Sequence, residues 1–328
     1  MNKFLLLRIF DALLLLGVFA LSLATILALF APDWWVGDIL SHLRVQYALA
    51  LCVLVVGFVL RRRWLISGLV LLPLLLNLSV LVPLFMPAPV MAKAMGRPLK
   101  ILHYNLDMTS SDHAVAFQFL RNSAPDILFV QELSPALAEQ LPRELADYRV
   151  VYAHVLDNTH GSALLLPTNS VLQVIHASEV HLPAASPRPL IHATLALDGQ
   201  AFTLMSLHVI RPKDAYTEQI QAQEYAAASQ WIREQRQQHG YPILVLGDYN
   251  TTPWAARFQR FLQESGLHDT SLGFGYQPSW PAAAPVLFAI PIDHAVASAD
   301  MIILQRNVGP NLGGDHKALE LTFAIEDS

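Results

Sequence analysis

The sequence has one cysteine, and Cys52 lies within an apolar run. One chain therefore cannot form an internal disulfide or a cysteine-ligated metal site. The HExxH spacing typical of zinc hydrolases is missing as well, and there is no internal repeat or low-complexity tract. Charge is also scarce, since charged residues make up 14% of the 328 residues. Soluble proteins average about 25%, so part of the chain is expected to avoid water.

Uncharged apolar runs are concentrated near the N-terminus. Residues 12–31 and 64–92 carry no charge, and each reaches the roughly 20 residues that a membrane-crossing helix needs. Between them, a further run at 45–60 is shorter, so the three runs in chain order are 12–31, 45–60 and 64–92. A cleaved signal peptide is the alternative for the first run, but its apolar stretch is longer than a typical signal core. We therefore predict three membrane helices.

The charges between these runs predict their orientation. Lys3 and Arg8 precede the first run, and three arginines at 61–63 separate the second from the third. The loop 31–44 holds two acidic residues against one arginine, which suits the outer side. Three basic residues directly after the third run argue the other way, and the topology inverts if the second run does not cross. The majority of the charges predict that the remainder of the chain lies outside.

Splitting the chain separates charge as well as hydropathy. We predict a membrane region at 1–92, a linker at 93–99 and an outer domain at 100–328. Residues 1–97 hold eight Lys or Arg and three Asp or Glu, a balance of +5, whereas 98–328 hold thirteen and twenty-three, a balance of −10. The outer domain thus lacks the broad basic surface that drives nonspecific binding to nucleic acid.

Short strand-like apolar runs alternate with helical patterns throughout the outer domain. The longest helical pattern begins near Ala215 and stops before Gly240. Another follows Pro253, where Thr251 or Thr252 is the expected cap. This alternation predicts an α/β fold in which helices cover a strand core.

Polar residues suited to catalysis stand at the predicted strand ends. They are Asn105, Glu132, His208, Asp248, Asn250, Asp293, Asp315 and His316. A carboxylate in apolar surroundings costs several kcal/mol unless it is paired or binds a metal. Several such groups therefore indicate one shared polar site. Oxygen donors without thiols favour Mg²⁺ or Mn²⁺ over zinc.

Six motifs in order carry a resemblance to a known family. They are NLD from Asn105, QEL with Glu132, SLH ending at His208, GDYN at 247–250, IDHAVAS at 292–298 and GDH at 314–316. From about residue 98 to 325, the chain resembles the endonuclease/exonuclease/phosphatase superfamily. The resemblance implies a two-sheet α/β sandwich of deoxyribonuclease I type. With its apolar N-terminal region, the chain is similar to a bacterial membrane-anchored branch, which implies an inner-membrane protein with a periplasmic or extracellular domain.

The resemblance also implies where the metal and the attacking water bind. Glu132 would be the main metal ligand, with Asn105 beside it and Asp315 completing the metal environment. Asp248 would orient or deprotonate the water, and Asn250 would bind the phosphate. An Asx turn before a helix is the purely structural alternative for the DxN pair.

Histidine roles follow from the same resemblance. His208 would contact the phosphate or protonate the leaving oxygen. His316 would stabilise the transition state or act as the base, with Asp293 orienting its ring, so the choice of base between Asp248 and His316 stays open. His294 should point away from Asp293 along a strand and pack or face solvent rather than take part in catalysis.

Two further residues are candidate substrate contacts. Arg211 could pair with phosphate or remain solvated on its loop, and Trp280 could face the substrate or pack its own loop. Two motifs depart from the family pattern: GDH lacks the usual preceding Ser, and the segment around Ser162 matches the expected Gly-Asn-Ala stretch only loosely.

We therefore predict a membrane-anchored, divalent-metal-dependent phosphoesterase. Its substrate would be a phosphodiester or phosphomonoester of nuclease, phospholipid or inositol-phosphate type. The alternative is a non-catalytic binding or scaffold module that retains the fold. The lipid bilayer is the expected partner, and no feature of the sequence indicates a protein partner.

Overall fold

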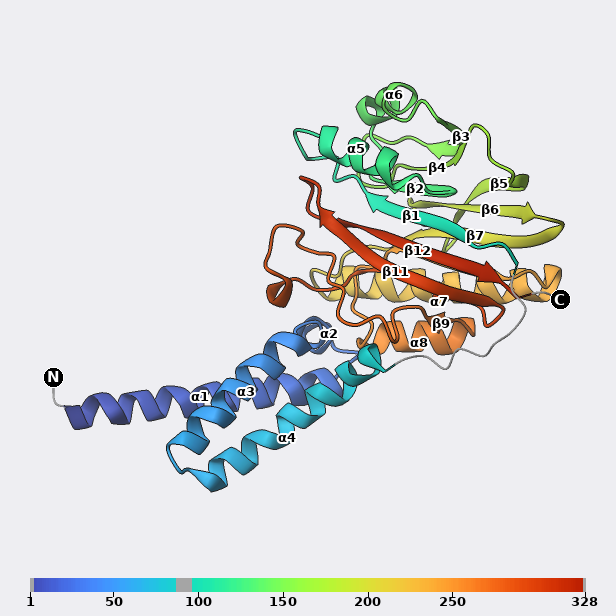
Figure 1. The fold of residues 1–328 in the computed structure, drawn as a ribbon. Helices are drawn as coiled ribbons and strands as arrows, with labels where there is room; N and C mark the ends of the chain where they lie inside the picture. Colours follow the sequence, from blue (N-terminus) through green and yellow to red (C-terminus); the bar gives the residue numbers. More distant parts are fainter. Residues whose placement is uncertain (1–2, 87–95, 327–328) are drawn as a thin grey trace.

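The computed structural model describes residues 3–86 and 96–326, with side chains from Arg8 onward. Residues 87–92 of the third apolar run and 93–95 of the predicted linker lie outside the described residues. The chain forms an N-terminal helical unit beside a larger α/β unit (Figure 1).

Three long helices lie side by side in the helical unit. They are α1 (Lys3–Phe30), α3 (Arg44–Leu60) and α4 (Trp64–Leu81), with α2 (Trp35–Ser41) between α1 and α3 and the 3₁₀ turn η1 (Val82–Phe85) after α4. Two stretches, Arg8–Phe30 and Trp64–Phe85, are long and apolar enough to cross a membrane. The remaining predicted span, 45–60, meets this test only if α2 and α3 count together across their 66° bend. Helix α2 was not predicted, because seven residues are too few to show a helical period.

Polar side chains inside the helical unit bond to one another. The buried Arg44 donates from Nη1 to Asn77 Oδ1 at 3.1 Å, and Asn77 Nδ2 donates to Thr25 Oγ1 at 2.9 Å. This chain of contacts joins α3, α4 and α1. At the other end of the unit, Arg61 pairs with Asp11 at 2.5 Å. Polar residues facing a helix interface in this way are typical of membrane bundles.

Two mixed six-stranded sheets form the α/β unit. The first has the order β11 (Met301–Asn311), β12 (Lys317–Ile325), β1 (Leu99–Asn105), β2 (Ile127–Gln131), β4 (Ser162–Pro167), β3 (Tyr148–His154). The second has the order β5 (Gln173–His181), β6 (Pro189–Leu197), β7 (Gln200–His208), β8 (Ile243–Asp248), β10 (Asp293–Ala297), β9 (His268–Asp269). The two-sheet α/β sandwich expected from the sequence is confirmed.

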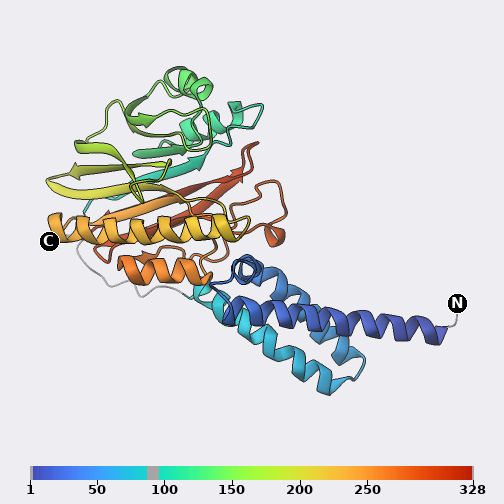
Figure 2. The same cartoon turned by 180° about the vertical axis from the view of Figure 1, so that it is seen from behind.

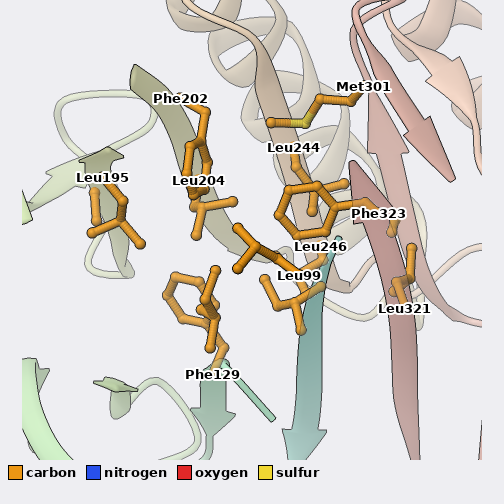
Figure 3. Packing of buried hydrophobic residues seen from close by; sticks show 14 of the residues in the cluster. Leu99, Phe129, Leu195, Phe202, Leu204, Leu244, Leu246, Met301, Leu321 and Phe323 are labelled. Carbon is orange, nitrogen blue, oxygen red and sulfur yellow. The ribbon is translucent and has the colours of Figure 1, made fainter. Parts of the chain in front are cut away.

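The central strands of each sheet are buried on both faces. Leu99 and Phe129 of the first sheet pack against Phe202 and Leu246 of the second (Figure 3). On the outer faces, α5 (Ala114–Ser123) and α6 (Pro135–Glu144) cover the first sheet, and α7 (Ala215–His239) and α8 (Ala256–Ser265) cover the second (Figures 1 and 2). Because neighbouring strand residues point to opposite faces, central strands must be apolar at nearly every position.

Helix α7 ends as predicted, at Gly240, whose φ of 70° is the left-handed conformation that glycine adopts readily. The predicted cap of the next helix is wrong. Helix α8 starts at Ala256, and its N-cap residue Ala255 makes no side-chain hydrogen bond. Thr252 is buried instead, with Oγ1 3.1 Å from Nδ1 of His42 in the helical unit. A tertiary contact has replaced the local cap.

The helical unit docks on the turn before α8. Trp254 is buried, donates from Nε1 to the Ser41 carbonyl at 2.8 Å and stacks on Tyr276. Nearby, Gly275 N donates to the carbonyl of Leu84 at 2.7 Å. These bonds hold the end of α2 and the end of η1 against the α/β unit.

Replacing Trp254 with alanine should loosen this docking. Loss of a buried tryptophan costs on the order of 3 kcal/mol, so amide hydrogen exchange in α2 should accelerate while exchange in β8 stays slow. Exchange mass spectrometry of the full-length protein in detergent measures both. Trp64→Ala is the matched control, since Trp64 is 65% exposed on α4. Equal protection of α2 in wild-type and Trp254→Ala protein would contradict the docking role.

Candidate active site

The predicted site residues lie along one rim of the sandwich because of how the strands run. Strands β1 and β2 are parallel, as are β7 and β8, so their carboxyl ends reach the same edge of each sheet. Asn105, His208 and Asp248 are the last residues of their strands, and Glu132 directly follows β2. Antiparallel β10 begins at this edge, with Asp293 opposite Asp248. His316 directly precedes β12, which runs antiparallel to β1.

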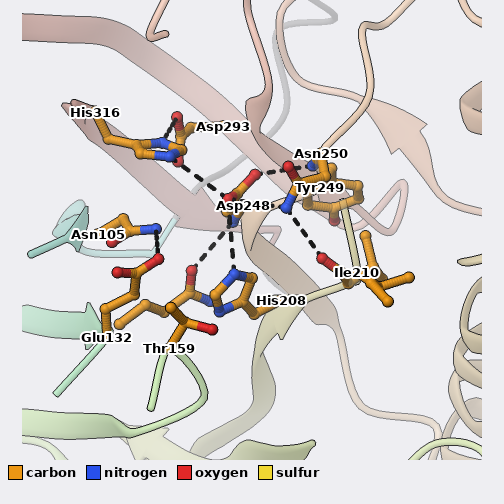
Figure 4. A network of polar contacts seen from close by, with 12 residues as sticks. Asn105, Glu132, Thr159, His208, Ile210, Asp248, Tyr249, Asn250, Asp293 and His316 are labelled. Carbon is orange, nitrogen blue, oxygen red and sulfur yellow. Dashed lines mark hydrogen bonds and ion pairs between the residues drawn. The ribbon is translucent and has the colours of Figure 1, made fainter. Parts of the chain in front are cut away.

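Asp248, Asp293 and His316 form the most tightly grouped part of the site (Figure 4). The ring Nδ1 of His316 lies 2.8 Å from Asp293 Oδ2, and its Nε2 lies 3.6 Å from Asp248 Oδ2. Burial alone would lower the pKa of His316, but Asp293 and Asp248 together raise it to about 10. The ring is therefore a cation between two carboxylates at neutral pH.

The two carboxylates of this group have opposite pKa shifts. Burial raises the pKa of Asp248 to about 7, although the His316 cation opposes the shift. Burial acts on Asp293 too, but contact with His316 holds its pKa below the usual range. Asp293 is thus the permanent partner of the imidazolium, while Asp248 can exchange a proton near neutral pH.

The GDYN turn holds Asp248 and Asn250 in place. Asn250 N donates to Asp248 Oδ1 at 2.8 Å, which is the Asx turn weighed from the sequence. The Asn250 side chain donates to Asp248 Oδ2 at 3.1 Å and to the Val209 carbonyl at 3.0 Å. Before the turn, Gly247 has a φ of 151°, and an added Cβ would lie 1.9 Å from the Leu207 carbonyl oxygen. Only glycine allows β7 and β8 to approach this closely.

Glu132 and Asn105 form a second polar group on the same rim. Glu132 has a left-handed φ of 58°, uncommon for a residue other than glycine. Its carboxylate accepts from Asn105 Nδ2 at 3.1 Å and from Met108 N at 3.2 Å. Both donors are neutral amides, and burial raises the pKa of Glu132. Strained backbone and a partly compensated buried anion are typical of a functional position.

His208 faces Asp248 from the opposite side to His316. Its Nε2 lies 3.7 Å from Asp248 Oδ2, and its ring meets that of His160 edge to face at 6.2 Å. Burial, followed by the neighbouring His160 and His316, lowers the pKa of His208 to about 3. His208 is therefore neutral while His316 is charged.

These groups open into a cleft of about 750 Å³. At its edge, the guanidinium of Arg211 lies 4.7 Å from the ring centroid of Trp280. Trp280 Nε1 in turn donates to Asp315 Oδ2 at 3.0 Å. Arg211, Trp280 and Asp315 all line the cleft, but Asp315 does not join the buried group.

Within the described residues, one set of three His, Asp or Glu side chains has ligand atoms all within 4.8 Å of one another: Asp248, Asp293 and His316. The predicted metal residues Asn105 and Glu132 lie apart from it as a bonded pair. His294 packs between Tyr249 and Phe258, as expected of a structural residue.

Several contributors to the site carried no signal in the sequence as catalytic residues. Gln131 bridges the sheets, donating from Nε2 to Ser206 Oγ and to the Leu207 carbonyl, both at 2.9 Å, and accepting from Asp248 N at 3.3 Å. His103 lies fully buried, with Nδ1 4.0 Å from Asp293 Oδ1. Arg188 lines the cleft. Only the position of Gln131 beside Glu132 in the QEL motif hinted at a role.

Comparison with known proteins agrees with this arrangement. The family model described as Endonuclease/Exonuclease/phosphatase family matches residues 102–316. No curated protein matches the sequence. Among solved structures, D. rerio TDP2 complexed with single strand DNA product has 18% identity and a TM-score of 0.56, covering 70% of this chain and 99% of its own.

Two bacterial structures are similar to the same extent. An endonuclease/exonuclease/phosphatase family protein from Bacteroides thetaiotaomicron has 14% identity and a TM-score of 0.59, covering 71% of this chain and 99% of its own. The B. thetaiotaomicron mannosyl-6-phosphatase Bt3783 has 14% identity and a TM-score of 0.57, covering 69% and 99%. At these identities the likeness shows the fold.

Replacing Asp293 with asparagine should lower the pKa of His316 by about 1 to 3 pH units, since the ring loses its bonded counter-ion. Ring NMR of ¹³C-histidine-labelled protein measures the titration, and Asp300→Asn is the control. The folded pKa of about 10 exceeds the ordinary 6.5, so this pairing stabilises the fold fully below pH 6.5 and is lost as pH rises through 10. An unchanged His316 titration in Asp293→Asn would refute the pairing.

Proposed function

Because the chain belongs to the endonuclease/exonuclease/phosphatase family, we propose that it is a membrane-anchored phosphoesterase that uses Mg²⁺ or Mn²⁺. Members of this family are phosphoesterases of nuclease or phosphatase type. The observation that carries the proposal is the carboxylate of Asp248. It is buried, has a pKa of about 7 and lies between a charged and a neutral histidine in an open cleft.

The donor set fits a hard divalent cation. Glu132 and Asn105 offer oxygen atoms, and burial leaves Glu132 short of a balancing charge. We assign the ion to these two residues, with Asp315 next to the site. The set of Asp248, Asp293 and His316 is the other candidate, but His316 Nδ1 and Asp293 Oδ2 are already bonded to each other. When bound, the ion would neutralise phosphate charge and make a water more acidic.

The remaining residues divide the proton transfers. Asp248 takes a proton from the attacking water, because its pKa of about 7 suits a general base at neutral pH. The imidazolium of His316, oriented by Asp293, stabilises the charge that builds on the phosphoryl oxygens. Asn250 orients the water and phosphate from the same turn. His208 contacts a phosphate oxygen near the leaving group. The phosphorus–oxygen bond to the leaving alcohol breaks, and that oxygen takes a proton from solvent water. Asp248 releases the proton of the attacking water to solvent, so the reaction balances.

Anchoring is supported by the path of the helices. Helix α1 runs toward the α/β unit, α3 runs away from it and α4 returns (Figure 1). The arginines 61–63 and Asp11 therefore lie at the end far from the α/β unit. Basic residues prefer the cytoplasmic side, so we propose a bacterial inner-membrane protein whose catalytic domain is periplasmic or extracellular.

Asp248→Asn and Glu132→Gln should each lower metal-dependent phosphoester hydrolysis by about 10²-fold or more, because each removes a charge used in the reaction. Purified protein is assayed with Mg²⁺ or Mn²⁺ on bis-p-nitrophenyl phosphate and p-nitrophenyl phosphate, and EDTA should abolish activity. Calorimetry should show weaker Mg²⁺ binding in Glu132→Gln.

Matched controls come from the protein surface. Asp198→Asn lies in the turn between β6 and β7, and Glu139→Gln is exposed on α6. Both should retain wild-type rates. Full activity of Asp248→Asn and Glu132→Gln, or calorimetry in which wild-type protein binds no divalent ion, would refute the proposed reaction.

The proposed topology predicts which thiols can be labelled from outside. In a Cys52→Ser background, a membrane-impermeant maleimide should label Gln238→Cys on α7 in intact bacterial spheroplasts. It should label Arg63→Cys, between α3 and α4, only after the cells are permeabilised. Labelling of Arg63→Cys alone in intact spheroplasts would show the opposite orientation.

A further inference from the structure

One wall of the active-site cleft comes from the helical unit. Ile39 of α2, together with His42 and Leu43 in the turn before α3, lines the same cleft as Asp248 and His316. Leu43 is 39% exposed, so its apolar side chain can contact a ligand that enters the cleft. The hydrogen bond between His42 and Thr252, and the bond that Trp254 Nε1 donates to the Ser41 carbonyl, hold this wall next to the catalytic turn.

A second apolar element lies beside this wall. The 3₁₀ turn η2 (Val286–Phe288) carries three exposed side chains, and Phe288 is 71% exposed. Gln46 Nε2 of α3 donates to the Leu287 carbonyl at 2.8 Å, which holds the turn next to the first turn of α3 (Figure 1). The same loop continues to Ile290 and Ile292, which line the cleft.

Cationic side chains line the same cleft. Arg188, Arg211 and Lys213 line it together with His160. Arg188 is neutralised by Glu224 at 2.6 Å, whereas Arg211 lies over the face of Trp280. A ligand that contacts both the apolar wall and these cations must have a polar part and an apolar part.

We propose that the substrate is a lipid phosphoester that resides in the bilayer into which α1 and α4 insert. This proposal rests on the proposed phosphoesterase activity and names its substrate class. The polar head lies toward Arg211 and Lys213, and the chains lie along Ile39 and Leu43 and leave past η2 into the membrane. Water attacks phosphorus, the phosphorus–oxygen ester bond breaks, and the alcohol departs with a proton.

The position of the wall favours a lipid over a soluble phosphoester. Helix α2 directly follows α1, which can cross a membrane, and precedes α3, which is apolar and long enough only together with α2. Ile39 and Leu43 therefore lie next to a membrane-crossing helix, where a lipid leaving the bilayer would first meet the enzyme. Exposed apolar groups gathered at one place usually have a partner that covers them. Tethering also raises the effective concentration of any substrate in the same membrane.

The test compares a bilayer lipid with a soluble ester. Full-length protein in phosphatidylcholine nanodiscs is supplied with dioleoyl phosphatidic acid or dioleoyl phosphatidylglycerol, and separately with their dihexanoyl forms as monomers and with bis-p-nitrophenyl phosphate. Wild-type protein should cleave at least one dioleoyl lipid, with a higher kcat/KM than for the dihexanoyl form of that lipid or for bis-p-nitrophenyl phosphate. Burial of one leucine or phenylalanine contributes about 1.5–3 kcal/mol. Leu43→Asn and Phe288→Asp should therefore each lower the ratio of lipid to soluble hydrolysis by about tenfold or more.

Val115→Asp is the matched control, because Val115 is 53% exposed on α5, and it should keep the wild-type ratio. Phe288 is 71% exposed on η2, so its substitution tests the proposal even if Leu43→Asn fails to fold. Cleavage of bis-p-nitrophenyl phosphate without cleavage of either lipid, or a ratio unchanged in both variants, would overturn the lipid substrate and leave the phosphoesterase standing. No hydrolysis of any substrate would overturn both.

Discussion

The site depends on the burial of carboxylates at the rim where both sheets end. Asp248 cannot be left as a lone anion in the core, since burial raises its pKa to about 7. Neighbouring side chains stabilise the Asp248 carboxylate in this buried position. Gln131 reaches from the first sheet to accept from the Asp248 amide, and the His316 cation lies 3.6 Å from the carboxylate. The same contacts connect the two sheets, so the positions of the catalytic side chains depend on how the sheets pack.

Backbone strain gathers around this rim. Glu132 and Asn250 have φ values of 58° and 47°, and Gly247 reaches 151°. Such conformations persist only where the surrounding structure holds them. At Glu132 the left-handed backbone turns the chain away from the direction of β2. The Glu132 carboxylate then accepts a hydrogen bond from the Asn105 side-chain amide. At Asn250 the left-handed backbone closes the Asx turn over Asp248. A relaxed backbone would point both side chains elsewhere.

The helical unit contributes more than an anchor. The end of α2 and the following His42 dock on Trp254 and Thr252, which lie four and two residues after the catalytic turn. Side chains from this part of the helical unit form a wall of the cleft. Any tilt of the helices against the sandwich would therefore change the shape of the cleft. The helices that would attach the protein to the membrane thus also shape the entrance to the active site. Helix α2 therefore does more than connect α1 to α3.

Much of the architecture was determined by the sequence itself. Apolar runs and strand-to-helix alternation predicted an α/β fold, because they depend on local periodicity and on residue type. Six ordered motifs carried the family resemblance, which implied the two-sheet sandwich and the roles of the residues at its rim. What the tertiary structure decided are contacts between distant segments. Thr252, one of the two expected caps of α8, instead contacts His42, which is 210 residues away in the sequence. Helix α8 begins later, at Ala256. His103 lies behind Asp293, and Asp315 bonds to Trp280 instead of joining the buried acids. Local patterns cannot encode which strand ends will face each other, because that depends on how two separately formed layers pack.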